Sequence, residues 1–318
     1  MPSIAEVRQY LGGQIFGKPF VPNVDLSNKT YVTTGGNTGL GLECAKHLAN
    51  LKAAKIILAC RNIEKGEKAK KSILEMKPIP NIAIAVWHVD QSNFKSVLAF
   101  GERLKTLEKL HGFIANAGLE TVTFERTEGY ENSLTVNVIS TIMLSVLALP
   151  KLKETAKANG ARTNLVIVGS IQHVFAPSPR LDIGDGRSIF EVLSEEKNAD
   201  MMGRYELSKL MVQMCEKEIA ERLDAGAKEE SPVVVSCINP GWCATELSRY
   251  YDKGRISDVG AWRDSGEETH GQYLSECLVK TESSFVRSKE GDRIQKRLWK
   301  ELCEIIERLS PGATSAVC

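Results

Sequence analysis

The chain has 318 residues, of which 42% are hydrophobic and 25% charged, and these values are ordinary for a globular protein with a substantial core. Its 41 basic and 40 acidic residues nearly cancel, which argues against binding nucleic acid mainly through net charge. The eight cysteines show no CxxC spacing, so we expect reduced, mostly buried thiols and a cytoplasmic location.

The N-terminal residues, MPSIAEVRQYLGGQIFGKPF, contain no basic segment followed by an apolar run, so we expect no secretory signal. Residues 1–28 precede the first strand pattern and are predicted to form an extension over the surface. The longest apolar stretch, VISTIMLSVLALP at 138–150, falls short of the length that spans a bilayer, so we expect no stable membrane insertion.

From residue 30 onward, short β-branched runs alternate with longer amphipathic ones. Continuously apolar strands separated by helices predict βαβ units, hence a parallel sheet covered on both faces. The predicted fold is α/β, a single doubly wound Rossmann-type domain over 29–318 with about six strands. The expected strands are TYVTT, KIILAC, IAIAVWHV, GFIANAG, TNLVIVGS and PVVVSCINPG, and the expected helices cover 39–52, 63–76, 92–109, 126–155, 203–225, 265–279 and 291–309.

Two segments interrupt the alternation. Residues 171–204 form a long insert between the fifth strand and its helix, and ligands of open α/β sheets bind at such strand ends, so we expect a lid or pocket wall. Residues 242–290 follow the last predicted strand and are expected to form a largely helical substrate-binding segment.

The first strand is followed by TGGNTGLG at 34–41, which opens the first helix. In a doubly wound fold this turn meets the pyrophosphate of a dinucleotide, and bare backbone lets the phosphates approach the helix N–H groups. The alternative is a purely structural turn. The candidate cofactor-binding residues here are Gly35, Asn37, Thr38, Gly39, Leu40 and Gly41.

The second strand ends in Cys60 and is followed by Arg61, where NAD-binding folds place an acidic residue. An arginine there pairs with a 2′-phosphate, which favours NADP(H) over NAD, although a plain surface arginine is the alternative. Asp90, at the end of the third strand, either meets the adenine or caps the helix that follows.

Tyr205 and Lys209 stand four residues apart on a predicted helix, so their side chains lie on one face. An ammonium beside a phenol favours the phenolate, so we expect Lys209 to lower the pKa of Tyr205 towards neutrality. A phenol tuned in this way acts as a general acid or base on an alcohol or a carbonyl.

Together these motifs resemble the short-chain dehydrogenase/reductase family over roughly residues 29 to 310. Within that family, ACRN after the second strand and the late RLWKELCEII helix resemble retinol-dehydrogenase-like and carbonyl-reductase-like members. The resemblance is carried, in order, by TGGNTGLG at 34–41, ANAG at 115–118, Asn137 in LTVNVIS, Ser170 in VIVGS, Tyr205 with Lys209, and NPGWCAT at 239–245.

The resemblance implies a catalytic tetrad, Asn137, Ser170, Tyr205 and Lys209. Tyr205 would be the acid/base, Lys209 would also bind the nicotinamide ribose, Ser170 would hydrogen-bond the substrate oxygen, and Asn137 would hold a water of a proton relay. Further cofactor contacts would come from Asn116, Ala117, Gly118, Pro240, Gly241 and Thr245. Ser170 and Tyr205 are 35 residues apart because of the insert, so the substrate pocket differs from that of compact relatives.

The expected function is an NADP(H)-dependent oxidoreductase that interconverts a carbonyl and an alcohol on a small, apolar molecule, in the direction of reduction. Two alternatives stay open: a nucleotide-binding protein without turnover, and an isomerase or a cyclase coupled to reduction. Many family members pair through the two long helices, whereas carbonyl-reductase-like members with inserts are often monomers, so we expect a monomer or a homodimer. The five histidines show no ligand spacing, so we expect no metal.

Overall fold

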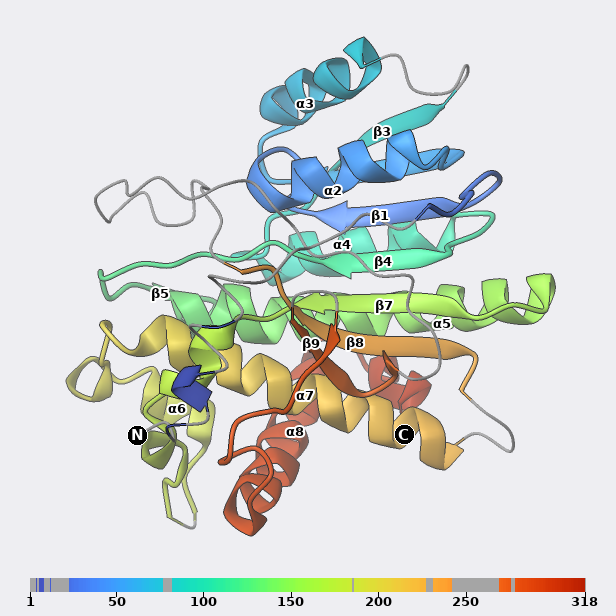
Figure 1. Cartoon of the computed structure of the whole chain (residues 1–318). Helices are drawn as coiled ribbons and strands as arrows, with labels where there is room; N and C mark the ends of the chain where they lie inside the picture. The colour runs from blue at the N-terminus through green and yellow to red at the C-terminus, as the bar shows by residue number, and fades with distance from the viewer. Residues whose placement is uncertain are drawn as a thin grey trace.

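The computed structural model describes residues 4, 6–8, 12, 23–76, 82–184, 186–226, 231–241, 269–275 and 278–317. In these residues the main sheet has eight strands in the order β10-β9-β8-β7-β4-β1-β2-β3, and neighbours are parallel except β9 and β10 (Figure 1). A separate hairpin joins β5 (Arg126–Thr127) and β6 (Tyr130–Glu131). The strands of the main sheet are β1 (Thr30–Thr34), β2 (Lys55–Cys60), β3 (Ala83–His88), β4 (Gly112–Ala115), β7 (Thr163–Val168), β8 (Val233–Asn239), β9 (Gln272–Ser275) and β10 (Leu278–Val279).

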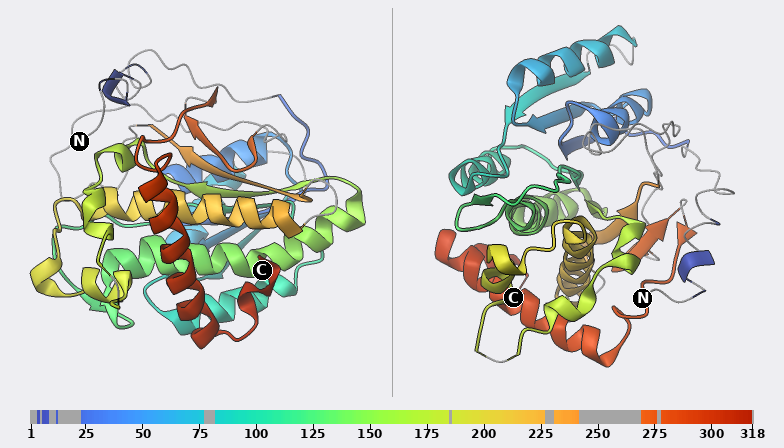
Figure 2. Two further views of the ribbon diagram at one scale, coloured as in Figure 1. Left: turned by 90° about the horizontal axis from the view of Figure 1, so that it is seen from below. Right: turned by 90° about the vertical axis from the view of Figure 1, so that its left-hand side faces the viewer.

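Helices cover both faces of this sheet (Figure 2). One core lies under α2 (Gly39–Asn50) and α3 (Ile63–Glu75). The larger core lies on the other face, among α4 (Phe94–Lys105), α5 (Thr141–Asn159), α6 (Ile189–Leu193), α7 (Arg204–Gly226) and α8 (Lys289–Leu309). Every residue of β8 is buried, as expected for a strand with helices on both sides. The predicted single doubly wound α/β domain is therefore confirmed.

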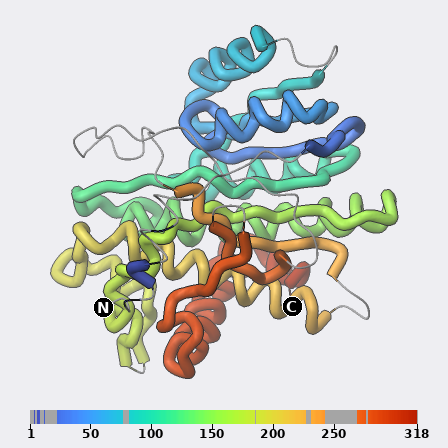
Figure 3. The backbone as a smooth tube through the Cα atoms, in the orientation of Figure 1, coloured from blue at the N-terminus to red at the C-terminus, as the bar shows by residue number. Residues whose placement is uncertain are grey.

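The insert folds as short helices beside the start of α7 (Figure 3). It contains α6 and the 3₁₀ turns η2 (Ile171–Phe175), η3 (Ser178–Leu181) and η4 (Glu196–Asn198). Ile189 and Phe190 of α6 are fully buried in the larger core. The insert is therefore packed onto the domain next to the predicted catalytic helix.

Two of the expected helices were wrong in type or extent. The one at 265–279 is wrong where the structure describes it, because residues 272–275 pair in parallel with β8 and continue the sheet, and β10 runs antiparallel to β9. The one at 126–155 starts later, since its first residues form the β5–β6 hairpin and a π-helix, η1 (Leu134–Ser140), precedes α5. The sheet accordingly has two more strands than expected.

The helix formed by η1 and α5 is longer than its apolar stretch suggested. Residues Leu134–Asn159 are long and apolar enough to cross a membrane, which corrects the expectation from the sequence, but 94% of the apolar window is buried within the protein. Burial to this extent is typical of a helix in the core of a protein. It contacts α4 and α7 and carries the central part of the larger core.

Most of the predicted N-terminal extension, residues 1–28, lies outside the described residues. At its end, Leu26 is buried in the smaller core and its N–H donates to the carbonyl of Leu51. Near its start, the Glu6 carboxylate accepts a hydrogen bond of 2.6 Å from the N–H of Ser284. The described parts of the extension thus contact the domain surface.

Candidate active site

The predicted site residues gather at the carboxyl edge of the parallel strands, which faces the viewer in the right-hand view of Figure 2. The glycine loop follows β1, residues 116–118 follow β4, Ser170 follows β7, and Pro240 follows β8. These four strands are neighbours in the sheet, so the loops after them lie side by side. Ligands of open α/β sheets bind at this edge.

The glycine loop is shaped by close packing within the protein. Gly35 and Gly39 have φ angles of 66° and 51°, a region that favours glycine. A Cβ on Gly41 would lie 2.4 Å from the carbonyl oxygen of Gly35 and 2.6 Å from Nδ2 of Asn116. The sequence explained these glycines only by the approach of a phosphate, and that explanation was incomplete. The backbone conformation already requires glycine at position 35, and the contact between helix and loop already requires it at position 41.

Thr34 and Asn116 tie the ends of β1 and β4 together. The Thr34 hydroxyl accepts hydrogen bonds of 2.9 Å from the N–H groups of Asn116 and Ala117. Nδ2 of Asn116 donates to the carbonyl of Thr34 at 2.8 Å. Asn116 thus steadies the sheet and fixes the loop against which Gly35 packs.

The N-terminus of α2 is open to an anion. Thr38 is the N-cap residue, with an extended backbone, but its side chain makes no capping hydrogen bond, and the first turn holds no acidic residue. The first N–H groups of a helix have no partner within the helix, and its dipole favours negative charge there. Asn37, Thr38, Gly39 and Leu40 are thus placed around a site that suits a pyrophosphate.

Arg61 follows the carboxyl end of β2, where the chain reads Cys60, Arg61, Asn62 without a carboxylate. Arg61 is exposed and has no ion-pair or hydrogen-bond partner among the described residues. The Cys60 thiol donates a hydrogen bond to the carbonyl of Asn62 at 3.3 Å. The side chain of Asn62 caps the N-terminus of α3. The guanidinium of Arg61 is thus available at the position that meets the ribose in this fold class.

Asp90 does not cap the helix that follows it, so that alternative was wrong. The side chain of Asn93 caps α4 by accepting from the N–H of Ser96 at 2.9 Å. One oxygen of Asp90 accepts from the N–H and hydroxyl of Ser92, at 3.0 and 2.7 Å. This turn holds Asp90 at the end of β3, and a contact with adenine stays a prediction.

Tyr205 and Lys209 lie on the first two turns of α7. Nζ of Lys209 is 5.6 Å from the centre of the Tyr205 ring, and it donates to the carbonyl of Val168 at 2.7 Å. Lys209 is buried, and burial lowers its pKa to about 8. The ammonium therefore lies between α7 and the end of β7.

The pKa of Tyr205 is raised, not lowered as the sequence predicted. Burial is the main cause and the nearby Glu120 carboxylate adds to it, while a hydrogen-bond interaction with the Ser170 hydroxyl lowers the pKa and Glu206 raises it further. Burial disfavours the phenolate more than its neighbours stabilise it. The interaction with Ser170 nevertheless brings these two predicted catalytic hydroxyls together.

Asn137 lies in the middle of η1, and π-helical turns occur often at functional sites. Its side chain accepts from the N–H of Leu119 at 2.8 Å and donates to the carbonyl of Leu119 at 2.8 Å and to the Ser208 hydroxyl at 3.0 Å. A Cβ on Gly118 would lie 3.2 Å from Oδ1 of Asn137 and 3.9 Å from Nζ of Lys209. The structure thus brings Asn137, Gly118 and Lys209 together; a water held by Asn137 stays a prediction.

Ser170 and His173 form one turn. The Ser170 hydroxyl accepts from the N–H of Gln172 at 3.2 Å, and the carbonyl of Ser170 lies 2.7 Å from Nδ1 of His173. Because a carbonyl only accepts, this contact places the proton on Nδ1. His173 is buried and packs edge-on against Tyr273, with ring centres 4.9 Å apart. His173 therefore holds the backbone of Ser170 through this hydrogen bond, and its own ring is held by packing against Tyr273.

At the end of β8, Gly241 has a φ angle of 80° and its N–H donates to Oδ1 of Asn239 at 3.2 Å. The same oxygen accepts from the N–H of Ile171 at 3.1 Å, so the turn carrying Pro240 and Gly241 is fixed to the turn after Ser170. Thr245, and residues 242–268 of the predicted substrate-binding segment, lie outside the described residues.

Sequence reasoning missed Glu120, Glu206 and the ion pair between Glu131 and Arg204. The two carboxyl groups beside Tyr205 could have been noted from their positions directly after ANAG and after the tyrosine itself. Glu131 and Arg204 are 73 residues apart, and no local pattern links them.

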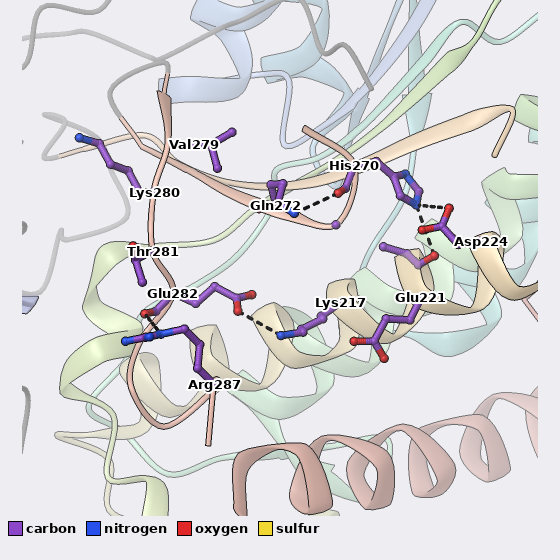
Figure 4. Close-up of a pocket in the computed structure, with 12 residues that line it drawn as sticks. Lys217, Glu221, Asp224, His270, Gln272, Val279, Lys280, Thr281, Glu282 and Arg287 are labelled. Carbon is purple, nitrogen blue, oxygen red and sulfur yellow. Dashed lines mark hydrogen bonds and ion pairs between the residues drawn. The ribbon is translucent and has the colours of Figure 1, made fainter. Parts of the chain in front are cut away.

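A polar cavity of about 510 Å³ lies elsewhere, against the second half of α7 and the strands β9 and β10 (Figure 4). Two pairs of charged side chains in its lining are partnered with each other: Lys217 with Glu282 at 3.1 Å, and His270 with Asp224 at 3.3 Å. None of the tetrad lines it. The predicted catalytic residues thus lie apart from this cavity. Within the described part of the chain, no group of three or more His, Cys, Asp or Glu side chains is placed to hold a metal ion.

Comparison with known proteins agrees with this geometry. Residues 29–182 match the family model of the short chain dehydrogenases. A short chain dehydrogenase/reductase of Cryptosporiopsis sp. (strain 8999) is 36% identical, over 96% of this chain and 99% of its own length. A short chain dehydrogenase of Alternaria solani is 39% identical, over 73% of this chain and 78% of its own length.

Two solved structures show the same fold. One, a protein from Mycobacterium paratuberculosis described as uncharacterized, covers 92% of this chain and 97% of its own with a TM-score of 0.62 and 22% identity. The other, a short-chain dehydrogenase from Sphingobium yanoikuyae in complex with NADPH, covers 69% and 73% with a TM-score of 0.52 and 19% identity. With a relative matched over nearly its whole length and the family's motifs gathered at one edge of the sheet, the chain belongs to the short-chain dehydrogenase/reductase family of oxidoreductases.

Proposed function

We propose that this protein is an NADP(H)-dependent reductase that converts a carbonyl group of a small organic substrate into an alcohol. The observation that carries the proposal is the gathering of Ser170, Tyr205 and Lys209, from β7 and α7, at the carboxyl edge beside an uncapped helix N-terminus. Two hydroxyl groups that lie together in this way suit an oxygen on which negative charge develops.

Each residue has a task in this reaction. NADPH, when bound, supplies the hydride for the carbonyl carbon. Ser170 donates a hydrogen bond to the carbonyl oxygen, and Tyr205 gives that oxygen its proton. The raised pKa of Tyr205 keeps the phenol protonated at neutral pH, which suits the acid needed for reduction better than the base needed for oxidation. Lys209 binds the ribose in this proposal, and its hydrogen bond to the carbonyl of Val168 supports that role by holding the ammonium at the end of β7.

The residues at the cofactor end fit NADPH. The open N-terminus of α2 suits the pyrophosphate, and Arg61 suits a 2′-phosphate. Residues 60–62, after β2, include no carboxylate that could accept hydrogen bonds from the ribose hydroxyls. The NADPH bound to the structural neighbour from Sphingobium yanoikuyae supports the same choice. Cells keep most of their NADP pool reduced, which also favours reduction.

We further propose that the protein is a monomer. Helix α8 crosses α7 (Figure 2, left), where Nε2 of Gln295 donates to Glu218 at 3.2 Å and the Arg222 guanidinium lies 5.6 Å from the Trp299 ring. This covers part of the surface of a long helix through which many family members pair. Sedimentation at equilibrium tests this: a mass near 35.0 kDa supports it, and a mass near twice that contradicts it.

The test of the reductase function is deuterium transfer from 4-deuterated NADPH to a panel of ketones, with Tyr205→Phe as the variant. Net reduction carries deuterium into the alcohol, whereas an isomerase or a protein without turnover leaves none there. We expect Tyr205→Phe to lose at least about 100-fold in turnover while it still binds NADPH. Equal turnover in wild type and variant would contradict the role of Tyr205.

A further inference from the structure

The peptide unit between Ser170 and Ile171 is held from both sides by side chains. The carbonyl of Ser170 accepts from the Nδ1–H of His173 at 2.7 Å. The N–H of Ile171 donates to Oδ1 of Asn239 at 3.1 Å. The carbonyl and the N–H of a trans peptide point in opposite directions, so these two contacts fix its plane. His173 and Asn239, which we call the Ser170 clamp, are each 2% exposed, so bulk water does not compete for either contact.

The chain just before Ser170 is fixed in the same manner. The carbonyl of Val168 accepts from Nζ of Lys209 at 2.7 Å. The N–H of Gly169 belongs to the same peptide unit and donates to the carbonyl of Ile238 at 2.8 Å. Because the backbone is held both before and after Ser170, its Cα and Cβ have little freedom to move relative to β7 and β8.

The Ser170 hydroxyl has a further contact in the turn η2 that follows. Its oxygen accepts from the N–H of Gln172 at 3.2 Å. A hydroxyl oxygen that accepts from the protein still has its own proton to donate. Helix α7, which carries Tyr205 and Lys209, packs directly against η2. The position of the Ser170 hydroxyl relative to these two side chains therefore depends on the clamp.

A histidine at position 173 is unfavourable for packing alone. Its Nε2 is shielded from solvent and has no hydrogen-bond partner in the part of the chain that the structure describes. Burial lowers the pKa of His173, so the ring is neutral and Nε2 is an unsatisfied acceptor, which destabilises the fold. A phenylalanine would pack edge-on against Tyr273 without this penalty.

The feature that the imidazole adds is its donor to Ser170. The turn itself does not require that donor, because the backbone N–H of His173 already donates to the same carbonyl at 3.2 Å. The Nδ1–H contact is a second hydrogen bond on one carbonyl, and it holds the backbone of Ser170 more firmly than the turn alone. This points to a role at Ser170, not to a role in folding.

Asn239 joins the Ser170 turn to the next candidate binding loop. Its Oδ1 also accepts from the N–H of Gly241 at 3.2 Å, and its Nδ2 donates to the Ser275 hydroxyl at 2.9 Å. The neutral ring of His173 has one N–H and donates it to Ser170 alone. The two halves of the clamp thus differ, because only Asn239 also holds the turn for which the resemblance implies contact with the cofactor.

We propose that His173 and Asn239 are positioning residues for the reduction, which hold the Ser170 hydroxyl where it meets the substrate oxygen together with Tyr205. This inference rests on the proposed reductase function and adds two residues to it. Neither residue contacts the substrate: His173 acts through Ser170, and Asn239 acts through both Ser170 and Gly241.

The test is a double-mutant cycle with Ser170→Ala. His173→Phe keeps an aromatic ring against Tyr273 and removes the donor, whereas the side-chain amide of His173→Asn places an N–H donor where Nδ1 was. Each variant is made alone and with Ser170→Ala. The control is His111→Phe, because His111 also contacts the backbone, accepting from the N–H of Thr30 at 3.0 Å, but at the opposite edge of the sheet.

The measured quantities are the affinity for NADPH, and kcat and KM for the ketone that wild type reduces fastest among acetophenone, cyclohexanone and 2-octanone. We expect His173→Phe to lower kcat by about 10-fold or more, while KM and the Kd of NADPH change by less than about 3-fold. His173→Asn should recover most of this loss, and His111→Phe should keep the wild-type kcat.

The cycle shows whether the effect passes through the Ser170 hydroxyl. In Ser170→Ala, which is already slow, adding His173→Phe should lower kcat by less than about 2-fold, because the group that the clamp positions is missing. A loss that is equally large with and without Ser170→Ala overturns the inference. So does a kcat of His173→Phe within about 2-fold of wild type, or a His173→Asn variant as slow as His173→Phe.

Asn239→Ala gives a second, independent reading. It should lower kcat by about 10-fold or more and also weaken NADPH binding by about 5-fold or more, because Oδ1 fixes the turn at Gly241 as well. A kcat loss that is equally large in the Ser170→Ala background, or no loss at all, contradicts the role of Asn239 at Ser170.

Amide exchange separates this inference from the proposed function. If wild type reduces none of the three ketones, the reductase proposal fails for them, and the clamp is tested by hydrogen exchange of the Ile171 N–H. We expect this exchange to be at least about 10-fold faster in His173→Phe and Asn239→Ala than in wild type, with exchange of Val166 in the middle of β7 unchanged. Exchange of Ile171 at the wild-type rate in both variants, or equal acceleration at Val166, overturns the inference.

Discussion

Nε of Arg204 lies 3.4 Å from Oε2 of Glu131 in the protein interior, where the two side chains are 1% and 0% exposed. Glu131 also accepts from the N–H groups of Ser133 and Leu134, at 2.7 and 3.3 Å, and so holds the start of η1. Nη2 of Arg204 donates to the carbonyl of Leu193 in the insert at 2.7 Å. One buried ion pair thus joins the π-helix, the insert and the residue before Tyr205.

Removing one partner of this pair leaves a buried charge unpaired. Arg204→Met and Glu131→Gln are each expected to lower the free energy of unfolding by about 3 kcal/mol in urea titrations. Arg204→Lys should lower it less, because the lysine keeps part of the interaction with Glu131. The double variant Arg204→Met/Glu131→Gln should lose less than the two single losses added together, because no unpaired charge is left. Single variants within about 0.5 kcal/mol of wild type would contradict this role.

Gly41 is required by contact with the protein itself. A Cβ there would lie 2.4 Å from the backbone oxygen of Gly35, which cannot move away as a side chain can. We expect Gly41→Ala to cost about 1–3 kcal/mol of stability and to weaken NADPH binding, since the loop must shift. Gly226→Ala at the end of α7, where a Cβ meets nothing within 4 Å, is the matched control and should leave both unchanged.

We expect Glu216 to make the protein less stable as pH rises. It is fully buried on α7, neither carboxyl oxygen has a hydrogen-bond partner, and burial with repulsion from Glu282 raises its pKa well above the usual value. The folded state therefore holds a proton that the unfolded state releases above about pH 4.5, so the free energy of unfolding falls as pH rises from there towards the raised pKa.

Glu216→Gln removes this dependence. The variant should gain stability relative to wild type between pH 5 and 8, by up to about 1.4 kcal/mol per pH unit, as measured by urea unfolding at several pH values. Because only the difference between variant and wild type is compared, other titrating groups cancel. A difference that stays constant with pH would show that Glu216 does not titrate in this way.

Lys209 should make cofactor binding depend on pH. Its pKa is lowered to about 8 by burial, so in the free protein the ammonium loses its proton around that pH, whereas an ordinary lysine stays charged. We expect the affinity for NADPH, followed by fluorescence, to weaken as pH rises from 7 to 9. Lys209→Arg keeps its charge and should flatten the profile; the same profile in both proteins would exclude Lys209 as its source.

The sequence was sufficient to predict that the candidate residues lie at one edge of the sheet, because its motifs rest on local geometry. Tyr205 and Lys209 share a helix face through their spacing, and Ser170 follows a strand whose end must lie at the carboxyl edge. Residues 272–275 were assigned wrongly to a helix because a short apolar run has no distinct period, and only pairing with β8 decides its structure.

The electrostatics could not be predicted in the same way. The pKa of Tyr205 depends on how deeply α7 is buried and on Glu120, which is 85 residues away in the sequence. Likewise, Glu131 and Arg204 meet only because the insert folds back onto the domain. Such quantities follow from tertiary packing, which a motif does not encode.

The measurement that tests the central claim most directly is a fluorescence titration with NADPH and with NADH, for wild type, Arg61→Ala and the control Lys71→Ala at the far end of α3. We predict that wild type and the control bind NADPH at least about 10-fold more tightly than NADH, and that Arg61→Ala loses this preference, since a charge-assisted contact contributes about 1.5–3 kcal/mol. Equal binding of both cofactors by wild type would contradict the role of Arg61, and binding of neither would contradict the assignment of this protein as a nicotinamide-dependent reductase.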